Sequence, residues 1–261
     1  MSYYTFISGA TGGIGRAFAQ AAAKKGYPLF LTGRSEEKLS ALASELSAAS
    51  PEIKYFACDL TSESSIKSML AFADDNDVKF DRILNVAGVD TQKAFTDYTY
   101  DKVAFQIKVN VLATTFLTYE LLKRRAPKTE LLAISSMSGA SPMPYFALYS
   151  ASKSYITSLY TSLHYELKKE GVKVTAVLPG GVPTRPDIVA DIKGQGLWGR
   201  LSSKPASFVA EKSLKAVRKN KTVYVPGFFN KFLYFLIKIA PKKITLSFIA
   251  RRWKKIEKDA F

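Results

Sequence analysis

The sequence predicts a doubly wound α/β fold, in which helices cover both faces of a parallel sheet of about seven strands. Short apolar runs alternate along the chain with segments of helical period, as in right-handed βαβ units. The apolar runs are hydrophobic throughout, as strands buried on both faces should be. A glycine-rich turn follows the first of them. A chain of 261 residues is long enough for one large domain of this class.

The expected elements follow one another from the N-terminus without a solenoid repeat or a low-complexity linker. We expect strands at Tyr3–Ser8, Pro28–Thr32, Lys54–Ala57, Arg82–Ala87, Glu130–Ser135, Lys173–Leu178 and Thr222–Val225. Helices are expected between them, over segments such as RAFAQAAAKKG, EEKLSALASELSAA, SSIKSMLAFADD and KVNVLATTFLTYELLKRR. These elements predict a single domain over residues 1–227.

Two segments depart from this rhythm. Residues 183–206 are rich in proline and glycine and follow the sixth expected strand. A long segment at the carboxyl end of a strand is where a substrate lid would lie, and an ordinary surface excursion is the alternative. Residues 228–261 form a basic, apolar tail.

Charge and cysteine content limit the partners and the compartment. The formal net charge is +16, and nine Lys or Arg against Glu257 and Asp259 lie in residues 228–261. Basic residues gathered in a tail, with no nucleic-acid motif, argue against a nucleic-acid partner. Cys58 is the single cysteine, which excludes an intrachain disulfide and a cysteine-based metal site. With an N-terminus that runs straight into a strand, these features predict a cytoplasmic protein.

The glycine-rich turn SGATGGIG, Ser8–Gly15, lies between the first strand and the first helix. Gly9, Gly13 and Gly15 let the backbone turn tightly and approach a pyrophosphate, which the N-terminus of the helix would attract. Glycine turns between a strand and a helix are common, but the position in the first βα unit favours a Rossmann-type dinucleotide site.

The end of the second strand indicates which dinucleotide is preferred. An NAD site usually has an acidic residue there, to accept a hydrogen bond from the ribose 2′-hydroxyl. This chain has Gly33 and then Arg34, with Lys38 one helical turn further on. A guanidinium can grip a 2′-phosphate, whereas a carboxylate would repel it. We therefore expect NADP(H), with a surface arginine as the alternative.

A third signal is the segment SSMSGASPMPYFALYSASK. Tyr149 and Lys153 are four residues apart at the start of an expected helix, and hence on one face of it. Ser136 comes thirteen residues before Tyr149, at the end of the fifth strand. These three side chains can converge where that strand end faces the helix.

In these motifs the chain resembles the short-chain dehydrogenase/reductase family, in its compact single-domain form, over residues 3 to about 227. SGATGGIG matches the family's T-G-x-x-x-G-x-G with Ser8 at the first position, and NVAG at Asn85–Gly88 matches N-N-A-G with Val86 second. Further matches are the pair Asp59-Leu60, the helix residue Asn110, and PGGVPT at Pro179–Thr184. The tail resembles, loosely, that of the steroid and long-chain ketoacyl reductase branch.

The resemblance implies a catalytic tetrad of Asn110, Ser136, Tyr149 and Lys153. Tyr149 would exchange a proton with the carbonyl oxygen, Ser136 would hydrogen-bond that oxygen, and Asn110 would place a water in a proton relay. Lys153 and the positively charged oxidised nicotinamide would together lower the pKa of Tyr149, and Lys153 would also hold the nicotinamide ribose. The implied cofactor contacts are Gly9, Thr11, Gly13, Ile14, Gly15, Arg34, Asp59, Leu60, Asn85, Ala87, Gly88, Tyr149, Lys153, Pro179, Gly180, Val182 and Thr184.

The substrate pocket is expected to be apolar and lined by Val89, Met143, Phe146, Val182, Leu197 and Trp198. Such a lining suggests a steroid or a fatty-acyl carbonyl compound. The rival hypothesis is a regulator or scaffold that senses NADP(H) without turnover. No metal site is expected, because Asp101, Asp187 and Asp191 form no carboxylate pair. We expect Ser135 to be structural, His164 to lie at the surface or an interface, and the protein to form a homodimer or homotetramer.

The tail is predicted to form two helices separated by Pro241. The first is too short to span a bilayer, which needs about 20 apolar residues. The second carries an apolar stripe of Leu246, Ile249, Trp253 and Ile256 among the cations Arg251, Arg252, Lys254, Lys255 and Lys258. Such a helix fits an anionic membrane surface, and docking of the stripe on protein is the alternative.

Overall fold

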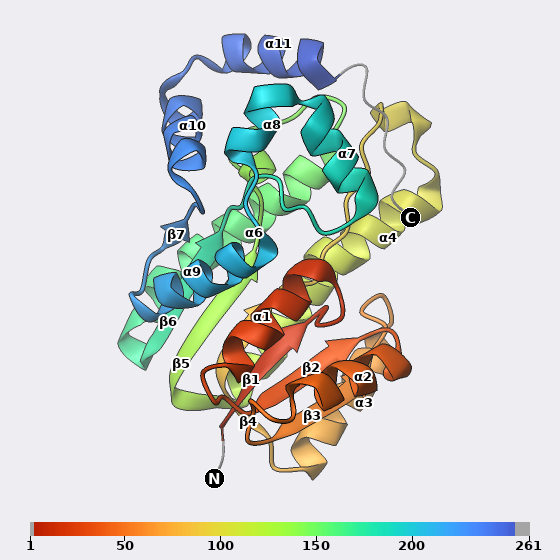
Figure 1. The fold of residues 1–261 in the computed structure, drawn as a ribbon, viewed down its shortest axis with the longest axis vertical. Helices are drawn as coiled ribbons and strands as arrows, with labels where there is room; N and C mark the ends of the chain where they lie inside the picture. The colour runs from red at the N-terminus through yellow and green to blue at the C-terminus, as the bar shows by residue number, and fades with distance from the viewer. Residues whose placement is uncertain (1–2, 254–261) are drawn as a thin grey trace.

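The computed structural model describes residues 3–253, which contain one seven-stranded parallel sheet of order β3-β2-β1-β4-β5-β6-β7 (Figure 1). The strands are β1 Tyr3–Ser8, β2 Leu29–Gly33, β3 Ile53–Ala57, β4 Lys79–Asn85, β5 Arg125–Ile134, β6 Val172–Val177 and β7 Val223–Tyr224. The seven expected strands are present, and the predicted Rossmann-type fold is confirmed. The strand order reverses between β1 and β4, and ligands bind at such switch points.

Helices cover both faces of the sheet. Those that connect the strands are α1 Gly13–Ala23, α2 Glu36–Leu46, α3 Glu63–Asp75, α4 Tyr100–Ile107, α5 Thr114–Lys123, α6 Ala147–Glu166 and α9 Ala206–Arg218. A π-helical turn, η2 Lys108–Ala113, joins α4 to α5, and a short 3-10 helix, η3 Met137–Gly139, follows β5. Serine side chains cap the N-termini of α2 and α3, at Ser35 and Ser62.

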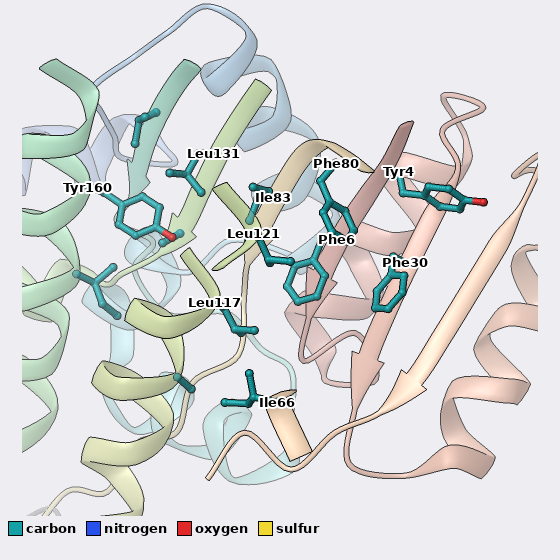
Figure 2. Close-up of a cluster of buried hydrophobic side chains, with 14 of the residues drawn as sticks. Tyr4, Phe6, Phe30, Ile66, Phe80, Ile83, Leu117, Leu121, Leu131 and Tyr160 are labelled. Carbon is teal, nitrogen blue, oxygen red and sulfur yellow. The ribbon is translucent and has the colours of Figure 1, made fainter. Parts of the chain in front are cut away.

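Neighbouring strand residues point to opposite faces of the sheet and so build two separate cores. Phe6 and Phe30 pack with Phe80 and with α3, α5 and α6 on one face (Figure 2). Phe80 meets both of the other rings edge-on, at centroid distances of 5.8 and 5.7 Å. Ile7 and Leu31, each next in sequence to one of these phenylalanines, pack with α1, α2 and α9 on the other face.

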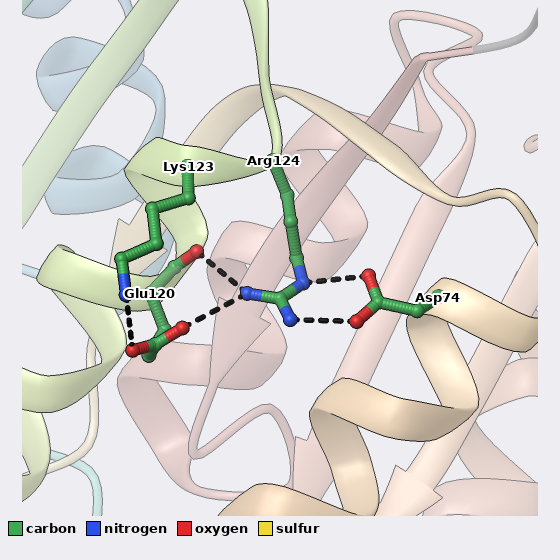
Figure 3. A network of polar contacts seen from close by, with 4 residues as sticks. All are labelled: Asp74, Glu120, Lys123 and Arg124. Carbon is green, nitrogen blue, oxygen red and sulfur yellow. Dashed lines mark hydrogen bonds and ion pairs between the residues drawn. The ribbon is translucent and has the colours of Figure 1, made fainter.

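A polar network links α3 to the end of α5. Arg124 donates two hydrogen bonds to the Asp74 carboxylate, at 2.7 and 2.6 Å, and two to Glu120, at 3.0 Å to its carbonyl and 3.1 Å to its carboxylate (Figure 3). Lys123 binds the other carboxylate oxygen of Glu120 at 2.7 Å. The planar guanidinium thereby bridges two helices, which a single flexible ammonium group could not do in this geometry.

The two irregular segments both fold into helices. The lid segment 183–206 forms α7 Pro186–Gly194 and α8 Gly196–Ser202, and the tail forms α10 Phe228–Ile239 and α11 Lys242–Trp253. Pro241 separates the tail helices, as expected. The stripe residue Ile256 and the cations Lys254, Lys255 and Lys258 lie outside the described residues. Within residues 3–253, no helix is long and apolar enough to cross a membrane.

His164 was expected at the surface or an interface, and this expectation is wrong. The side chain is buried, and its Nδ1 lies 2.9 Å from the carbonyl oxygen of Val174 in β6. The reason is that α6 packs along β6 down to its last turn, so the imidazole fills the space between helix and strand.

Candidate active site

A cavity of about 730 Å³ opens at the carboxyl ends of the strands. Its inner half is walled by the glycine turn after β1 and by the segments that follow β2, β3, β4, β5 and β6. Its outer half is walled by the lid helices and by both tail helices. The cavity therefore lies at the switch point of the sheet, where a doubly wound fold binds its ligands.

The glycine turn leaves room for a pyrophosphate at the N-terminus of α1. Gly9 has a φ of +64°, a conformation that favours glycine. A Cβ at Gly13 would overlap the Thr184 side chain, and one at Gly15 would overlap the Gly9 carbonyl. The N-cap residue Gly12 offers no side-chain cap, so the first N–H groups of α1 remain open to an anion.

Both departures from the family motifs lie at one junction. The Ser8 hydroxyl accepts hydrogen bonds from the backbone N–H groups of Val86 and Ala87, at 3.0 and 3.2 Å. Ser8 thus joins the end of β1 to the end of β4, and Val86 is buried in the core beneath. Ser8 does not line the cavity, whereas Val86 also forms part of its wall.

The wall after β2 and β3 would receive the adenosine half of a dinucleotide. Arg34 lines the cavity and has no ion-pair partner in the described part of the chain, so its guanidinium is available to a phosphate. Asp59 and Leu60 also line this wall. Asp59 is held by hydrogen bonds from the N–H and hydroxyl of Thr61, at 2.9 and 2.8 Å. Lys38 is exposed and does not line the cavity.

Tyr149, Lys153 and Ser136 converge on the wall between β5 and α6. The Lys153 ammonium lies 5.5 Å from the centre of the Tyr149 ring and donates to the Ile134 carbonyl at 2.9 Å. The Ser136 oxygen accepts from the N–H of Ser138 at 3.0 Å, and the Ser136 side chain is close enough to Tyr149 to act on the pKa of its hydroxyl. The structure therefore brings these three predicted residues together.

Burial changes the acidity of two of these groups. It raises the pKa of the Tyr149 hydroxyl, with a further rise from the Asp90 charge, while the Ser136 hydrogen bond and Arg185 act in the opposite sense. Burial lowers the pKa of the Lys153 ammonium to about 8, against a smaller opposing effect of Asp90. Strongly shifted groups in a cavity are typical of active sites.

Asn110 lies behind this group, in the π-helical turn η2. Its Oδ1 accepts from the N–H of Val89, and its Nδ2 donates to the Val89 carbonyl and to Ser152. The residue is fully buried and does not line the cavity. Its amide therefore holds the chain that leaves β4, a bonding pattern different from the water relay that the family resemblance implied.

Asn85 is the other expected contact that the structure places away from the cavity. Its Nδ2 donates to the hydroxyls of Tyr160 and Thr118, at 2.7 and 3.0 Å, within the core under α5 and α6. All the other expected cofactor contacts line the cavity: Gly9, Thr11, Gly13, Ile14, Gly15, Arg34, Asp59, Leu60, Ala87, Gly88, Tyr149, Lys153, Pro179, Gly180, Val182 and Thr184.

Ser135, treated as structural from the sequence, donates to the Lys153 carbonyl at 2.7 Å and contacts Thr157 at 2.8 Å. These contacts fix the strand end against α6. A Cβ at Gly139 would lie 2.7 Å from the Lys153 carbonyl carbon, so glycine is needed for η3 to approach the helix. Together they set the distance between Ser136 and the Tyr149 helix.

The outer half of the cavity is apolar and partly matches the expectation. Val89, Met143, Phe146, Val182 and Trp198 line it as expected. Leu197 does not: its side chain is 68% exposed on the outer side of α8. The tail supplies further lining residues that sequence analysis did not assign to the site, namely Leu233, Ile237, Thr245, Phe248, Ile249 and Trp253.

The sequence analysis also did not identify an ion pair in the wall of the cavity. Arg185 lies 3.3 Å from Asp90 and 3.1 Å from Asp187, and both Arg185 and Asp90 line the cavity. The pair joins the loop after β4 to the start of the lid. Their positions next to two motifs, NVAG and PGGVPT, were the available signal, but sequence separation hides the contact between them.

Asn230 in α10 connects the lid to the tail. Its Nδ2 donates to the carbonyls of Ser202, at the end of α8, and of Pro226, after β7, at 2.8 and 2.9 Å. The residue is buried and lines the cavity, and its Oδ1 has no hydrogen-bond partner in the described part of the chain. A buried acceptor of this kind remains available for an N–H or O–H group of a ligand.

A doubly wound sheet with a glycine cradle at its switch point defines the class of dinucleotide-binding α/β proteins. The family sequence model for short chain dehydrogenases matches residues 4–191 of this chain. An uncharacterized oxidoreductase of Staphylococcus epidermidis is 32% identical over 180 residues, covering 68% of this chain and 77% of that protein. One of Staphylococcus aureus is 32% identical over the same shares. The chain belongs to the short-chain dehydrogenase family and is an oxidoreductase of that family.

Solved structures share the fold. A structure of a 7β-hydroxysteroid dehydrogenase has a TM-score of 0.84 at 22% identity, covering 95% of this chain and 96% of its own. L-sorbose reductase from Gluconobacter frateurii, complexed with NADPH and L-sorbose, has a TM-score of 0.75 at 18% identity, with coverages of 87% and 95%. Coverage of 95% extends the first likeness into the tail helices.

Proposed function

We propose that this protein is an NADP(H)-dependent oxidoreductase that interconverts a carbonyl group and a secondary alcohol on a bulky hydrophobic substrate. One observation carries the proposal. Tyr149, Lys153 and Ser136 meet at the wall of a cavity whose other end is a glycine cradle, beside which lies Arg34, without an ion-pair partner among residues 3–253. Chemistry and cofactor binding would thus share one enclosed space.

The cofactor choice is supported by the end of β2. Gly33 and Arg34 line the cavity there, and no carboxylate occupies the position where an NAD site needs one. A guanidinium without an ion-pair partner suits a 2′-phosphate. Two of the structures that share the fold were determined with NADP(H) bound.

Carbonyl reduction needs a hydride and a proton, and the nicotinamide supplies the hydride when it is bound. Tyr149 donates its hydroxyl proton to the carbonyl oxygen, and takes a proton back when the alcohol is oxidised. The Ser136 hydroxyl donates a hydrogen bond to the same oxygen and stabilises the charge that develops on it. The Lys153 ammonium stabilises the tyrosinate, and Asn110 positions the Val89 segment behind it.

The apolar outer half of the cavity favours a large, hydrophobic substrate. Aromatic side chains from three separate segments line it, at Phe146, Trp198 and Trp253. A steroid or a fatty-acyl chain has the required bulk and polarity. The protein of similar fold that acts on a hydroxysteroid supports the first of these classes, since the likeness reaches into the tail.

The proposal is tested by a substrate panel followed through NADPH oxidation. We expect turnover of bulky ketosteroids or 3-ketoacyl thioesters, and weaker or no turnover of short aliphatic ketones and sugars. The same panel is run with NADH to measure the cofactor preference. NADPH binding without turnover of any substrate in either direction would refute the proposal and leave a regulator that senses the cofactor.

Self-association is proposed through the faces of α5 and α6. Phe116 and Tyr119 on α5 and Tyr155 and Tyr165 on α6 are exposed by 38–68%. Aromatic residues on adjacent helices are typical of interfaces between identical chains. We expect a dimer or tetramer by light scattering, and its dissociation by Phe116→Asp.

A further inference from the structure

The tail helices carry large apolar side chains on the side that faces away from the cavity. Phe228, Phe232, Phe235 and Ile239 follow one another on α10 at spacings of four, three and four residues, which places them on one helix face. Ile244 continues the series at the start of α11, and these five side chains are 51–88% exposed. We call these five residues the outer face of the tail. Folded chains seldom leave so much contiguous apolar surface uncovered unless it binds something.

The opposite side of the same helices faces the cavity. Leu233 and Ile237 of α10, and Ile249 and Trp253 of α11, line the cavity. Two residues of the stripe that the sequence analysis assigned to a membrane, Ile249 and Trp253, therefore face the cavity, and Trp253 packs on Phe146. The surface that could contact lipid is instead the outer face, which the sequence analysis did not identify.

The outer face is surrounded by positive charge. Residues 228–253 contain six Lys or Arg and no Asp or Glu. Lys231, Lys238, Lys242, Lys243 and Arg251 are exposed, and none has an ion-pair partner in the described part of the chain. Association of two copies through this face would bring two such sets of like charges together, which is unfavourable. An anionic surface would complement both the charge and the apolar side chains.

We propose that the outer face of the tail inserts into the interfacial layer of an anionic phospholipid bilayer, with the surrounding cations on the lipid headgroups. A helix of twelve residues is about 18 Å long, too short to span the hydrocarbon core, so the helices lie in the interface. Figure 1 shows α10 and α11 at the end of the molecule remote from β3, so the end that contains β3 would project away from the bilayer. This inference does not depend on the proposed reaction.

The test is sedimentation of the full chain with vesicles of equal parts phosphatidylglycerol and phosphatidylcholine, compared with pure phosphatidylcholine. We expect binding to the anionic vesicles at low salt, weakened by added salt, because exposed charges are screened beyond about 8 Å at physiological ionic strength. The triple variant Phe232→Ser, Phe235→Ser, Ile239→Ser should bind roughly tenfold or more weakly. The variant Lys238→Gln, Lys242→Gln, Lys243→Gln should lose the preference for anionic lipid.

Matched controls change equally exposed residues elsewhere. Phe95→Ser with Tyr100→Ser removes exposed aromatic surface near α4, and Lys24→Gln, Lys25→Gln, Lys219→Gln removes three exposed cations. Both controls should bind vesicles as the unchanged chain does, and NADPH binding by every variant checks the fold. The proposal is overturned if the full chain stays in the supernatant at low salt, or if the tail variants bind as well as the controls. It is also overturned if light scattering shows a dimer that only the triple tail variant loses.

Discussion

The indole of Trp253 lies nearly parallel to the phenyl ring of Phe146, with ring centres 6.3 Å apart and an interplanar angle of 20°. Phe146 in turn stacks on Tyr149, at 4.4 Å and 23°. The last described residue of the chain is thus two rings away from the candidate proton donor. A flat apolar substrate bound beside Tyr149 would be in contact with this wall.

Trp253→Ala should therefore change substrate selection more than cofactor binding. We expect kcat/KM for bulky apolar substrates to fall roughly tenfold, which corresponds to about 1.4 kcal/mol, while the Kd of NADPH stays unchanged. Arg251→Ala, on the exposed side of the same helix, is the matched control. Equal losses in the two variants would show that the indole does not contact substrate.

Tyr149→Phe removes one hydroxyl and keeps the ring that packs on Phe146. Turnover should fall by a factor on the order of 100 or more, because the proton donor is lost, with NADPH affinity nearly unchanged. Tyr145→Phe changes a neighbouring tyrosine that does not line the cavity, and should leave turnover intact. Near-normal turnover by the Tyr149 variant would remove the mechanism proposed above.

Arg34→Ala should weaken NADPH binding by roughly 1.5–3 kcal/mol, the scale of a hydrogen bond to a charged group. NADH binding should barely change, because NADH has no 2′-phosphate. Lys38→Ala is the control, since Lys38 is exposed and lies outside the cavity wall. Titration calorimetry with both cofactors measures the difference, and comparable use of NADH by the unchanged chain would contradict the assignment.

The pH dependence of reduction should show the charge on Lys153. Burial lowers the pKa of that ammonium to about 8, so the positive charge is present below pH 8 and is lost as the pH rises through it. We expect the rate of reduction to fall on the alkaline side with an apparent pKa near 8. Asp90→Asn removes a charge that raises the pKa of Lys153, and so should shift the alkaline fall in rate to lower pH. If the alkaline fall in rate keeps the same apparent pKa in this variant, a group other than Lys153 is responsible for it.

The network around Arg124 should make stability depend on acid pH. The hydrogen bonds of Arg124 hold the pKa of the Asp74 carboxyl below its usual range. The pKa of the Glu120 carboxyl is also lowered, mainly by the hydrogen bond from Lys123 and to a smaller extent by Arg124. This stabilisation is present above the unfolded values of about 4 and is lost as the pH falls through the lower folded values. Arg124→Met should lower Tm by roughly 2–4 °C at neutral pH, and by less below about pH 4.

Lys67→Met is the control for that experiment, because both side chains of the Glu63–Lys67 pair are exposed. Exposed pairs contribute little to stability, so its Tm should hardly move. A difference between the Arg124 variant and the unchanged chain that persists undiminished in acid would show that the loss comes from packing.

Much of the fold could be predicted from the sequence because strand and helix periods differ. Each strand buried on both faces is a continuous apolar run, as at Phe30 and Leu31, and the glycine turn marks where the first helix begins. His164 could not be placed, since α6 is amphipathic only in part and the register of its last turn against β6 depends on tertiary packing. The local sequence does not determine that register.

The inner half of the site was predictable for a different reason. A backbone turn with no room for a Cβ, at Gly13 and Gly15, leaves a direct mark in the sequence. The part of the outer half that the tail supplies was not predictable, because both sides of the tail helices are apolar and either could have faced the protein. Likewise Trp198 and Leu197 are neighbours, and only the packed helix decides which one lines the cavity.

Asn230 has a mechanical consequence for the whole outer half of the cavity. One amide group holds the last turn of the lid through Ser202 and the exit of the sheet through Pro226. If the lid swung away from the tail, a buried carbonyl would lose its donor, at a cost of about 1–3 kcal/mol. Residues 183–206 and the tail are therefore coupled, so that if this segment opens as a lid, a substrate would enter through one concerted opening of a two-part wall rather than through two independent gates.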